Sequence, residues 1–364
     1  MKVALVHDWL NQMGGAEDVL IELKRMYPDS PIYTSIYDRE HMPPEMRFWD
    51  IRTSWIDRLP LIHSQHRPYL PLYPLVFEHL NLSQYDVVVS NKSGFCHGIQ
   101  PGSALHVCYC LTPSRFVWNF DSYAAAEGLS PSVRLMLRPL LAALKRWELD
   151  ATRRVDDFIA ISTVVQKRIR RLYGRDSVVI FPPVDTARFQ PAGDPDDYYL
   201  CLGRLIPYKR TDLAILACNA MGRRLKIAGA GRDRANLERI AGPRVEFLGR
   251  VPDAEVSELM ARCRGFIFPG REDFGISPVQ AMAAGRPVIA LGGGGTLDTI
   301  IDGKTGVFFD EQTPESLVEA IRRFEKLSFD SAVIRRHAQR FDSRVFEQKF
   351  KAYVDERFAR HRGK

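Results

Sequence analysis

The sequence predicts an α/β fold made of two doubly wound domains, each with its own parallel sheet, which face each other across a cleft. Short runs of β-branched and other apolar residues alternate with longer amphipathic segments, the pattern of strand–helix alternation. The chain has 364 residues, enough for two domains of ordinary size. The alternation is interrupted once, over residues 181–197, where four prolines and four acids stand without a periodic pattern. We interpret this segment as the linker between the domains.

Eleven runs are strand candidates, and most of them are apolar on both faces, as is typical of strands buried inside a parallel sheet. Helical patterns lie between them, and one begins at Thr313-Pro314 with a capping residue followed by a first-turn proline. The domains are therefore expected over residues 1–188 and 189–343. A last helix at about 344–364 can pack on either domain, including back on the first. The predicted strands are residues 3–6, 87–89, 105–109, 158–161, 178–180, 199–202, 225–228, 245–248, 266–268, 288–290 and 307–309.

The composition is that of a globular protein, with 45% apolar and 26% charged residues, which excludes disordered, fibrous and disulfide-dependent classes. No apolar run is long enough for a membrane-spanning helix. The apolar run at the N-terminus ends at Asp8, too soon for a signal peptide, so we expect a cytoplasmic protein, with a peripheral place on the inner face of the plasma membrane as an option. The six cysteines form no CxxC pair and no zinc-ligand spacing, so they are predicted to be free buried thiols.

Basic residues are in excess, 51 Lys plus Arg against 44 Asp plus Glu, for a net charge of +7. Such a charge suits nucleic acid, a membrane surface or a phosphorylated substrate. Residues 131–175 hold eleven cations against four acids, and leucines are interleaved with the first cations. This pattern fits a helix at an anionic membrane surface, or a solvated helix face over a core. No series of aromatic residues accompanies the cations, so no nucleic-acid partner is expected.

Chemistry is expected in the loops that follow strands, because ligands of open α/β sheets bind at the carboxyl ends of the strands. Gly14 and Gly15 follow the first strand and precede a helix, which suits either an anion site or a plain turn. Arg204 and Lys209 stand five residues apart after the strand at 199–202. They can converge on a diphosphate or form a solvated basic turn.

Two further loops carry acids or glycines. Glu272 lies in a loop before a helix that we expect Ser277-Pro278 to open, and its carboxylate can accept hydrogen bonds from sugar hydroxyls. Gln280 stands three residues after Ser277, where a capping-box glutamine would bond back to the helix start. The four consecutive glycines 292–295 indicate either a close approach to a ligand or a flexible loop.

The order and spacing of seven motifs together are more specific than any one of them. They are Val6–Leu10, Gly14-Gly15, Thr112–Phe116, Phe181–Asp185, Gly203–Arg210, Phe247–Val251 and Glu272–Gly285. With these motifs the chain resembles, nearly end to end, the retaining GT-B glycosyltransferases of the glycosyltransferase family 4 type. That group includes GDP-mannose-dependent mannosyltransferases of bacterial polysaccharide and lipopolysaccharide assembly. The resemblance implies the GT-B fold, two Rossmann-like domains with a cleft between them.

The resemblance also implies residue roles. Arg204 and Lys209 would bind the donor diphosphate and neutralise its charge as it leaves, and Glu272 would contact the transferred sugar, so these three would be the catalytic residues. The backbone near Arg250 and Val251 would hold the base. The implied nucleotide-sugar site comprises Gly14, Gly15, Arg204, Lys209, Arg250, Val251, Glu272, Asp273, Phe274, Gly275, Ile276 and Gln280.

No metal and no cofactor beyond the nucleotide-sugar donor are implied, and the one Asp-x-Asp sequence, Asp194–Asp196, lies in the linker. Two positions depart from the family pattern. Gln280 stands where relatives have a second acid that bonds the ribose hydroxyls, and a glutamine can still accept one hydrogen bond and donate others. Leu111 stands where relatives often have a sugar-facing histidine, and leucine can form no hydrogen bond.

We therefore expect a metal-independent, retaining hexosyltransferase that moves mannose from GDP-mannose onto a lipid-linked or polysaccharide acceptor. The alternative is a catalytically weakened nucleotide-sugar-binding or scaffolding subunit of a glycan-assembly complex, which the two departures motivate. A nicotinamide oxidoreductase is a third hypothesis. It is disfavoured because the run Gly229-Ala230-Gly231 lacks the further glycine of a dinucleotide fingerprint and has Arg234 in its place.

Overall fold

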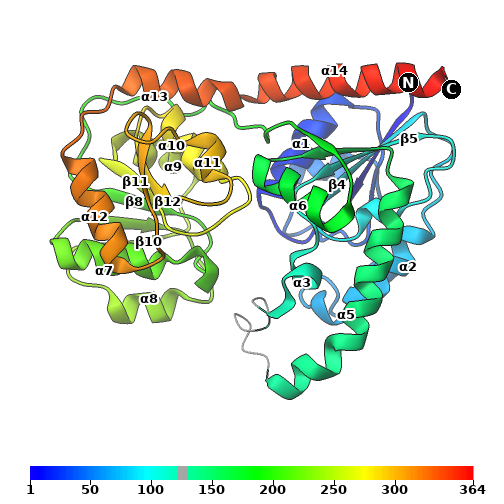
Figure 1. Cartoon of the computed structure of the whole chain (residues 1–364), viewed down its shortest axis with the longest axis horizontal. Coiled ribbons are helices and arrows are strands. Elements are labelled where there is room, and N and C mark those ends of the chain that lie inside the picture. Colours follow the sequence, from blue (N-terminus) through cyan, green and yellow to red (C-terminus); the bar gives the residue numbers. More distant parts are fainter. Residues whose placement is uncertain (122–123, 125–129, 364) are drawn as a thin grey trace. The chain divides into compact units, whose positions relative to one another are not determined.

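The computed structural model describes residues 1–121, 124 and 130–363, which form two compact units (Figure 1). Unit 1 consists of Met1–Phe181 together with the chain from Phe346 onward, and unit 2 is Pro182–Val345. Each unit contains one parallel sheet with helices packed on it, so the predicted fold class, an α/β fold of two doubly wound domains, is confirmed. Within the described ranges, no helix has the length and apolar character needed to span a bilayer.

Unit 1 has a seven-stranded sheet in the order β3-β2-β1-β4-β5-β6-β7, and every neighbouring pair is parallel. Its strands are β1 (Val3–His7), β2 (Ile32–Thr34), β3 (Ile51–Thr53), β4 (Val87–Lys92), β5 (Leu105–Cys110), β6 (Asp157–Ala160) and β7 (Ser177–Val179). Its helices include α1 (Gly15–Met26), α2 (Tyr73–Glu78), α3 (Arg115–Trp118), α5 (Pro131–Ala151), α6 (Thr163–Tyr173) and most of α14 (Ser343–Arg362).

Unit 2 has a six-stranded parallel sheet in the order β10-β9-β8-β11-β12-β13. Its strands are β8 (Tyr199–Leu202), β9 (Leu225–Ala228), β10 (Val245–Gly249), β11 (Gly265–Phe268), β12 (Val288–Leu291) and β13 (Gly306–Phe309). Its helices are α7 (Thr211–Met221), α8 (Arg234–Ile240), α9 (Asp253–Arg262), α10 (Ile276–Ala283), α11 (Thr296–Thr299), α12 (Pro314–Glu325) and α13 (Ser331–Ala338).

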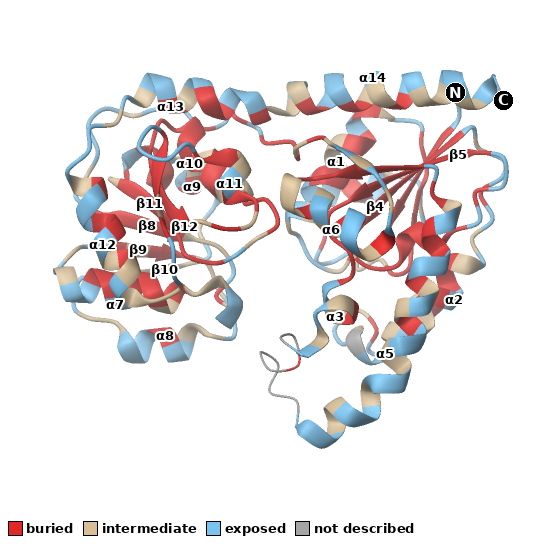
Figure 2. Ribbon diagram, viewed as in Figure 1, coloured by how far each residue is buried: buried red, intermediate tan, exposed pale blue. Residues whose placement is uncertain are grey.

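All eleven predicted strands are present, and two short strands, β2 and β3, were not predicted. Each of these has three residues, and β3 lies at the edge of the sheet with a largely exposed surface, so neither shows a long apolar run. The central strands are buried along their whole length, and Figure 2 shows the burial concentrated in the two sheets and on the helix faces that cover them. The six cysteines are free and buried, as predicted.

The predicted linker does not run free between the units. The division lies between Phe181 and Pro182, before the expected boundary at residues 188 and 189, because Val184 already forms a β-bridge opposite Asp342 and the Thr186 hydroxyl donates to the Asp342 carboxylate. The Val184 amide donates to the carbonyl oxygen of Phe341 over 3.1 Å. The beginning of the segment is therefore an integral part of unit 2.

The last helix, α14, packs on unit 1 from Phe346 onward. The rings of Phe346 and Phe350 lie 5.6 and 5.9 Å from the ring of Tyr109 on β5. The Arg357 guanidinium forms an ion pair with Asp157 at 2.7 Å. The sequence allowed this helix to pack on either domain. It packs on unit 1 through buried aromatic contacts and a partly buried ion pair.

Both sheets contain a switch point, where the chain's crossovers turn from one direction across the sheet to the other. In unit 1 it lies between β1 and β4, and in unit 2 between β8 and β11. Helices that leave the two switch strands run to opposite faces of the sheet, so their loops diverge and leave room for a ligand. The switch points are therefore the places in which to look for function.

Burial makes the stability of unit 1 sensitive to acid. His106 on β5 is fully buried, and its ring bonds to Ser90 Oγ at 2.9 Å and to the carbonyl oxygen of Arg154 at 2.8 Å. Burial lowers the pKa of His106 to about 4, against the smaller raising effects of the Arg154 carbonyl and the Asp156 carboxylate. The unfolded chain takes up this proton near pH 6.5 and the folded chain only near pH 4, so stability falls as the pH drops through that window.

We predict that His106 alone removes about 1.4 kcal/mol from the free energy of unfolding between pH 8 and pH 5.5. Urea titrations of the native chain and of His106→Gln at both pH values measure this. The variant should lose less stability than the native chain over the interval, by about that amount. An equal loss in the two proteins would show that His106 is protonated in the folded state.

Candidate functional site

Three of the predicted catalytic residues lie together at the switch point of unit 2. Arg204 and Lys209 follow β8, and Glu272 follows the adjacent strand β11. The two loops touch, because a side chain on Gly270 would begin 3.0 Å from the carbonyl oxygen of Lys209. Residues that are 63 or more positions apart in the sequence, such as Lys209 and Glu272, thus meet at one edge of the sheet.

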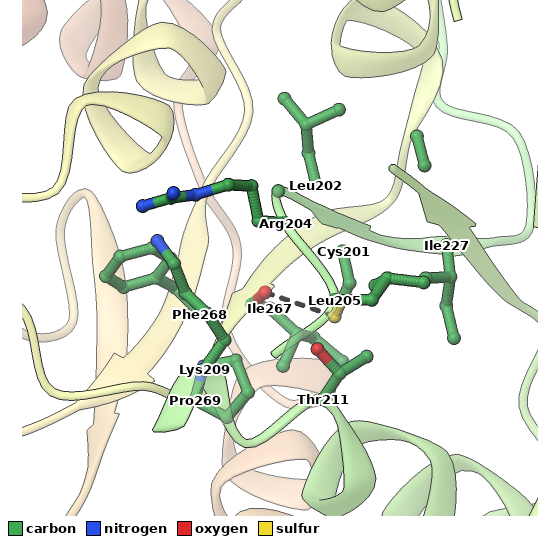
Figure 3. A pocket seen from close by; sticks show the side chains of 12 residues that line it. Cys201, Leu202, Arg204, Leu205, Lys209, Thr211, Ile227, Ile267, Phe268 and Pro269 are labelled. Carbon is green, nitrogen blue, oxygen red and sulfur yellow. Dashed lines mark hydrogen bonds between the residues drawn. The ribbon is translucent and has the colours of Figure 1, made fainter. Parts of the chain in front are cut away.

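Lys209 and Glu272 form a direct ion pair, and their side chains are only 21% and 19% exposed. The Lys209 ammonium also lies 5.8 Å from the ring centroids of Tyr208 and Phe268, within the range of a cation–π contact. The Arg204 side chain extends in the same direction as that of Lys209, on the same side of the pocket (Figure 3). Lys209 and Glu272 are therefore partly dehydrated and the exposed Arg204 stands beside them, an arrangement that can hold an anionic group beside a hydroxyl-bearing one.

A pocket lies behind these side chains, at the carboxyl ends of β8, β9 and β11 (Figure 3). It is lined by Cys201, Leu202, Gly203, Arg204, Leu205, Lys209, Thr211, Ile227, Ala228, Ile267, Phe268 and Pro269. Most of this lining is apolar, and the cations stand at its edge. The sequence did not indicate Phe268, Thr211 or the apolar lining residues as part of the site, because such residues are also typical of a hydrophobic core.

The four glycines at 292–295 support the Glu272 loop. A side chain on Gly294 would begin 2.2 Å from the Glu272 carbonyl oxygen, and one on Gly295 would begin 2.3 Å from Cα of Phe274. The Gly295 amide donates to the Glu272 carbonyl oxygen over 2.9 Å. The glycines thus permit a close approach, as one of the two predicted alternatives required, but the approach is to the chain's own backbone.

Gly229 and Gly231 are explained in the same way. A side chain on Gly229 would begin 1.9 Å from the Gly203 carbonyl oxygen, and one on Gly231 would begin 2.1 Å from that of Leu205. The Leu205 amide donates to the Ala230 carbonyl oxygen over 2.9 Å. Packing of the loop after β9 on the loop after β8 therefore accounts for these glycines without a dinucleotide.

The capping-box interpretation of Gln280 is wrong. Helix α10 begins at Ile276, its N-cap is Gly275 with φ of +93°, and no side chain caps it. Ser277 lies inside the first turn, and the third helical position, which a capping-box glutamine would occupy, is Pro278, so Gln280 is two residues too far along. Gly275, with a left-handed φ that glycine adopts readily, is the N-cap, two residues before the Ser277 that the Ser-Pro signal indicates. The half-buried Gln280 side chain is thus left with no capping role.

The other predicted contacts fall into three groups. Arg250 and Val251 lie in the loop after β10. This loop is hydrogen-bonded to the loop after β9, because the Gly229 amide donates to the Gly249 carbonyl oxygen over 2.6 Å. The Phe274 side chain is buried against Phe341 at 5.8 Å, so only its backbone can meet a ligand, and Asp273 is also buried. Gly14 and Gly15 lie in unit 1, at the N-terminus of α1.

The first turn of α1 carries its own carboxylate. Glu17 is buried and lies 3.3 Å from the His7 ring nitrogen Nε2. The other ring nitrogen of His7 lies 3.2 Å from Asn91 on β4. The anion site predicted at Gly14 and Gly15 therefore has an acid close by, which the sequence-based interpretation did not consider.

Sequence reasoning missed the buried charges of unit 1. Asp8 is 1% exposed, and its carboxylate accepts from the backbone amides of Ser93, Gly94, Phe95 and Cys96 at 2.6 to 2.8 Å. This acid directly after a buried strand was an available signal, because such positions organise the loops of a switch point. A second buried carboxylate, Glu148, pairs with Lys92 at 2.9 Å, and both side chains are 0% exposed.

Several of the cations between residues 131 and 175 are engaged within unit 1. Arg154 reaches Glu78 and the Gly98 carbonyl oxygen, Arg168 bonds to Thr112, Arg170 pairs with Asp176, and Arg175 bonds to backbone carbonyls. The excess of cations is therefore only partly available to an external partner.

Asp196 of the Asp-x-Asp sequence is paired with the Arg262 guanidinium through two contacts of 3.0 Å. Elsewhere in the described ranges, no three His, Cys, Asp or Glu side chains are grouped so that they could hold a metal ion.

Each half of the chain matches a family of glycosyltransferases. Residues 13–188 match the family described as Glycosyltransferase Family 4, and residues 184–341 match the one described as Glycosyl transferases group 1. The solved structure of Anabaena Alr3699/HepE in complex with UDP-glucose is similar over 98% of this chain and 100% of its own, with a TM-score of 0.73 and 18% identity. The sucrose-phosphate synthase of Thermosynechococcus elongatus has the same TM-score and identity, over 99% of this chain and 100% of its own.

This is the GT-B glycosyltransferase fold. Curated relatives are similar at the sequence level. An uncharacterized glycosyltransferase of Methanocaldococcus jannaschii, MJ1178, is 29% identical over 47% of this chain and 50% of its own length. The GDP-mannose-dependent alpha-(1-6)-phosphatidylinositol monomannoside mannosyltransferase of Mycolicibacterium smegmatis is 30% identical over 51% and 56%. The human alpha-1,3/1,6-mannosyltransferase ALG2 is 24% identical over 94% and 93%. The chain thus spans about half the length of the first two relatives.

The packing of the glycine loop can be tested by adding one methyl group within the GT-B fold. We predict that Gly295→Ala lowers the free energy of unfolding by about 1–3 kcal/mol, because the new carbon would overlap the backbone of Asp273 and Phe274. Gly292→Ala is the matched control, since its nearest neighbours in the same loop would lie at an ordinary 3.5 Å. Denaturant titrations compare the two, and equal midpoints would contradict the proposed packing.

Proposed function

We propose that this chain is a retaining glycosyltransferase that moves mannose from GDP-mannose onto a lipid-linked or polysaccharide acceptor. The observation that carries the proposal is the meeting of Arg204, Lys209 and Glu272 at the switch point of unit 2. A sugar nucleotide has a diphosphate next to a polyol, and this site has cations next to a carboxylate.

Each part of the donor then has a partner. Arg204 and Lys209 bind the diphosphate, the first as a planar fork and the second as a point charge. Glu272 accepts hydrogen bonds from hydroxyl groups of the transferred hexose. The backbone at Arg250 and Val251 holds the base, and the half-buried Gln280 bonds the ribose with its amide. No metal or further cofactor takes part in the proposal.

The reaction breaks the bond between the anomeric carbon and the diphosphate oxygen and forms one between that carbon and the acceptor oxygen. The acceptor hydroxyl attacks from the face that the diphosphate leaves, so the anomeric configuration is retained. Its proton passes to the departing phosphate oxygen. Arg204 and Lys209 stabilise the negative charge that develops on the leaving group, which is a transition-state effect rather than a gain in ground-state binding.

Mannose and GDP are supported by the GDP-mannose-dependent mannosyltransferase activity of the M. smegmatis relative and by the mannosyltransferase name of the human one. The structural relative bound to UDP-glucose, at 18% identity, supports only the fold. The choice of base is therefore the part of the proposal that most needs a direct measurement.

We predict that Lys209→Ala and Glu272→Ala each lower the rate of GDP-mannose turnover about 100-fold or more. Lys304→Ala, which removes an exposed cation elsewhere in unit 2, should leave the rate unchanged. Nucleotide release is measured with GDP-mannose, UDP-glucose and UDP-galactose, with and without an added saccharide. Near-normal rates in both site variants would refute the site assignment, and turnover of a UDP-sugar alone would refute the choice of base.

A catalytically weakened binding subunit is the second candidate, because Gln280 and Leu111 replace an acid and a histidine of the resembled family. Binding of a nucleotide sugar without release under any acceptor would favour it. In the same assay Gln280→Glu separates the two: a higher rate would show that the glutamine weakens catalysis, and a lower rate would show that it is a matched contact.

The membrane-facing part of the proposal concerns α5. Its first buried residue is Leu144, and its N-terminal end projects away from the sheet of unit 1 (Figure 1). Leu135 and Met136 on this projecting part are 63% and 70% exposed, beside the exposed Arg138. Apolar side chains interleaved with cations suit an anionic lipid surface.

We predict that Met136→Ser combined with Arg138→Glu lowers binding to vesicles of phosphatidylglycerol and phosphatidylcholine about tenfold, since each cation at such a surface contributes about 1 kcal/mol. Lys304→Glu makes an equal charge change in unit 2 and is the control. Sedimentation with vesicles of mixed and of pure phosphatidylcholine composition gives the measurement. Unchanged binding of the double variant would exclude this part of α5 as the contact.

A further inference from the structure

A single buried carboxylate joins α5 to the loops at the carboxyl edge of the unit 1 sheet. Glu148 lies in the C-terminal half of α5 and is 0% exposed. Its Oε1 lies 2.9 Å from the Lys92 ammonium at the end of β4, and its Oε2 accepts from the Trp118 indole N–H over 2.9 Å. The Tyr173 hydroxyl on α6 also donates to it.

The loop that follows β5 depends on the same carboxylate. The Ser114 amide donates to Glu148 Oε1 over 3.2 Å, and the Ser114 hydroxyl lies 2.9 Å from the same oxygen. The Lys92 ammonium donates to the Thr112 carbonyl oxygen over 3.3 Å. Thr112 is thus tied to the ion pair through its backbone carbonyl, and Ser114 through both its backbone amide and its side chain.

This network continues to the switch point. The Ser114 hydroxyl lies 2.8 Å from the Gly94 carbonyl oxygen, and the Gly94 amide donates to the Asp8 carboxylate over 2.6 Å. The loops after β1, β4 and β5 are therefore linked through Asp8 and Glu148, at the edge where an open α/β sheet binds its ligands.

Stability alone does not account for this ion pair. Burial by itself would lower the pKa of Lys92, but the Glu148 carboxylate and two nearby thiols outweigh that effect and hold the pKa above its ordinary value. The buried Lys92 side chain therefore keeps its proton at neutral pH and can donate to the Glu148 carboxylate. An apolar pair of similar volume is often as stable as a buried ion pair, whereas the hydrogen bonds of the charged pair select one loop conformation.

We propose that Glu148 and Lys92 are positioning residues, which hold the loop of Thr112–Ser114 in a fixed relation to α5 so that sugar transfer to the acceptor, and not donor binding, depends on them. The proposal rests on the proposed function in so far as it concerns transfer. The donor cations Arg204 and Lys209 belong to unit 2 and the loop of Thr112–Ser114 belongs to unit 1, so we assign this loop to the second substrate. The N-terminal end of α5 carries the exposed apolar residues described above. Because Glu148 on the same helix bonds to Ser114, it links the position of this helix to that of the Thr112–Ser114 loop.

Two double variants test the proposal without leaving a buried charge unpaired. Lys92→Met/Glu148→Leu removes the charges and every hydrogen bond to the carboxylate. Lys92→Met/Glu148→Gln removes the charges but keeps one oxygen, which at the Oε1 position can still accept from Ser114 and Tyr173 and loses only the bond from Trp118 to Oε2. Circular dichroism melts establish that both are folded before any comparison.

The first readout is independent of activity. Amide hydrogen exchange over residues 112–118 should be at least about tenfold faster in the leucine variant than in the native chain, and close to native in the glutamine variant, because local openings cost less free energy once the anchor is gone. Exchange over residues 199–209 of unit 2 should be unchanged in both. Native-like exchange over residues 112–118 in the folded leucine variant would overturn the positioning role.

The second readout is transfer, with GDP-mannose as donor and octyl mannoside as the acceptor probe. The leucine variant should keep its KM for GDP-mannose within twofold and lose at least tenfold in kcat, and the glutamine variant should recover most of that loss. Unchanged kcat together with faster exchange would overturn the link to transfer. If the native chain itself shows no turnover with any sugar nucleotide, the proposed function fails, while the exchange experiment still decides the role of the ion pair in holding the loop.

Discussion

The loops that leave a doubly wound sheet at its switch point must be held in place, because their helices run to opposite faces and pull them apart. The residues proposed to bind the donor stand in such loops, so their positions depend on the contacts that hold the loops. Unit 2 holds its loops by direct contact of backbone with backbone, at Gly229 on Gly203 and at Gly294 and Gly295 on the Glu272 loop. The loop backbones are thus held by these contacts, and the Lys209–Glu272 ion pair adds a link between the side chains of the loops after β8 and β11.

Unit 1 meets the same constraint with buried charge. The Asp8 carboxylate accepts hydrogen bonds from four backbone amides of the loop after β4. The Glu148 carboxylate accepts hydrogen bonds from four other residues. A buried carboxylate surrounded by donors is costly to disturb, because any loop movement strands a charge away from water. The glycine contacts leave no room for an added side-chain atom, but they do not orient the neighbouring side chains. The buried carboxylates orient each group that donates a hydrogen bond to them. The two units thus reach comparable order by means with different sensitivities to mutation.

The sequence predicted the strands well because burial on both faces makes them continuous apolar runs, as at Val87–Val89 and Val288–Ala290. It missed β2 and β3, which are too short for such a run, and it placed the start of α10 at Ser277 because a left-handed Gly275 leaves no pattern in the residues around it. Arg204, Lys209 and Glu272 could be found since they follow strands. Lys92 and Glu148 could not, because one stands at the end of a strand and the other on an amphipathic helix, and only the fold brings them together.

The ion pair of Lys209 with Glu272 has a consequence for the proposed reaction. In the structure each charge is compensated by the other. If a diphosphate binds Lys209, the half-buried Glu272 carboxylate loses its cation. The free-energy cost of leaving this carboxylate unpaired is offset only when another hydrogen-bond donor replaces the cation. The hydroxyl groups of a hexose are such donors, so the complete sugar nucleotide satisfies both groups, whereas the nucleoside diphosphate left after transfer satisfies only one. The same pair that organises the site would therefore favour binding of the donor over retention of the product, and its energy would be recovered when the product leaves and the two side chains rejoin.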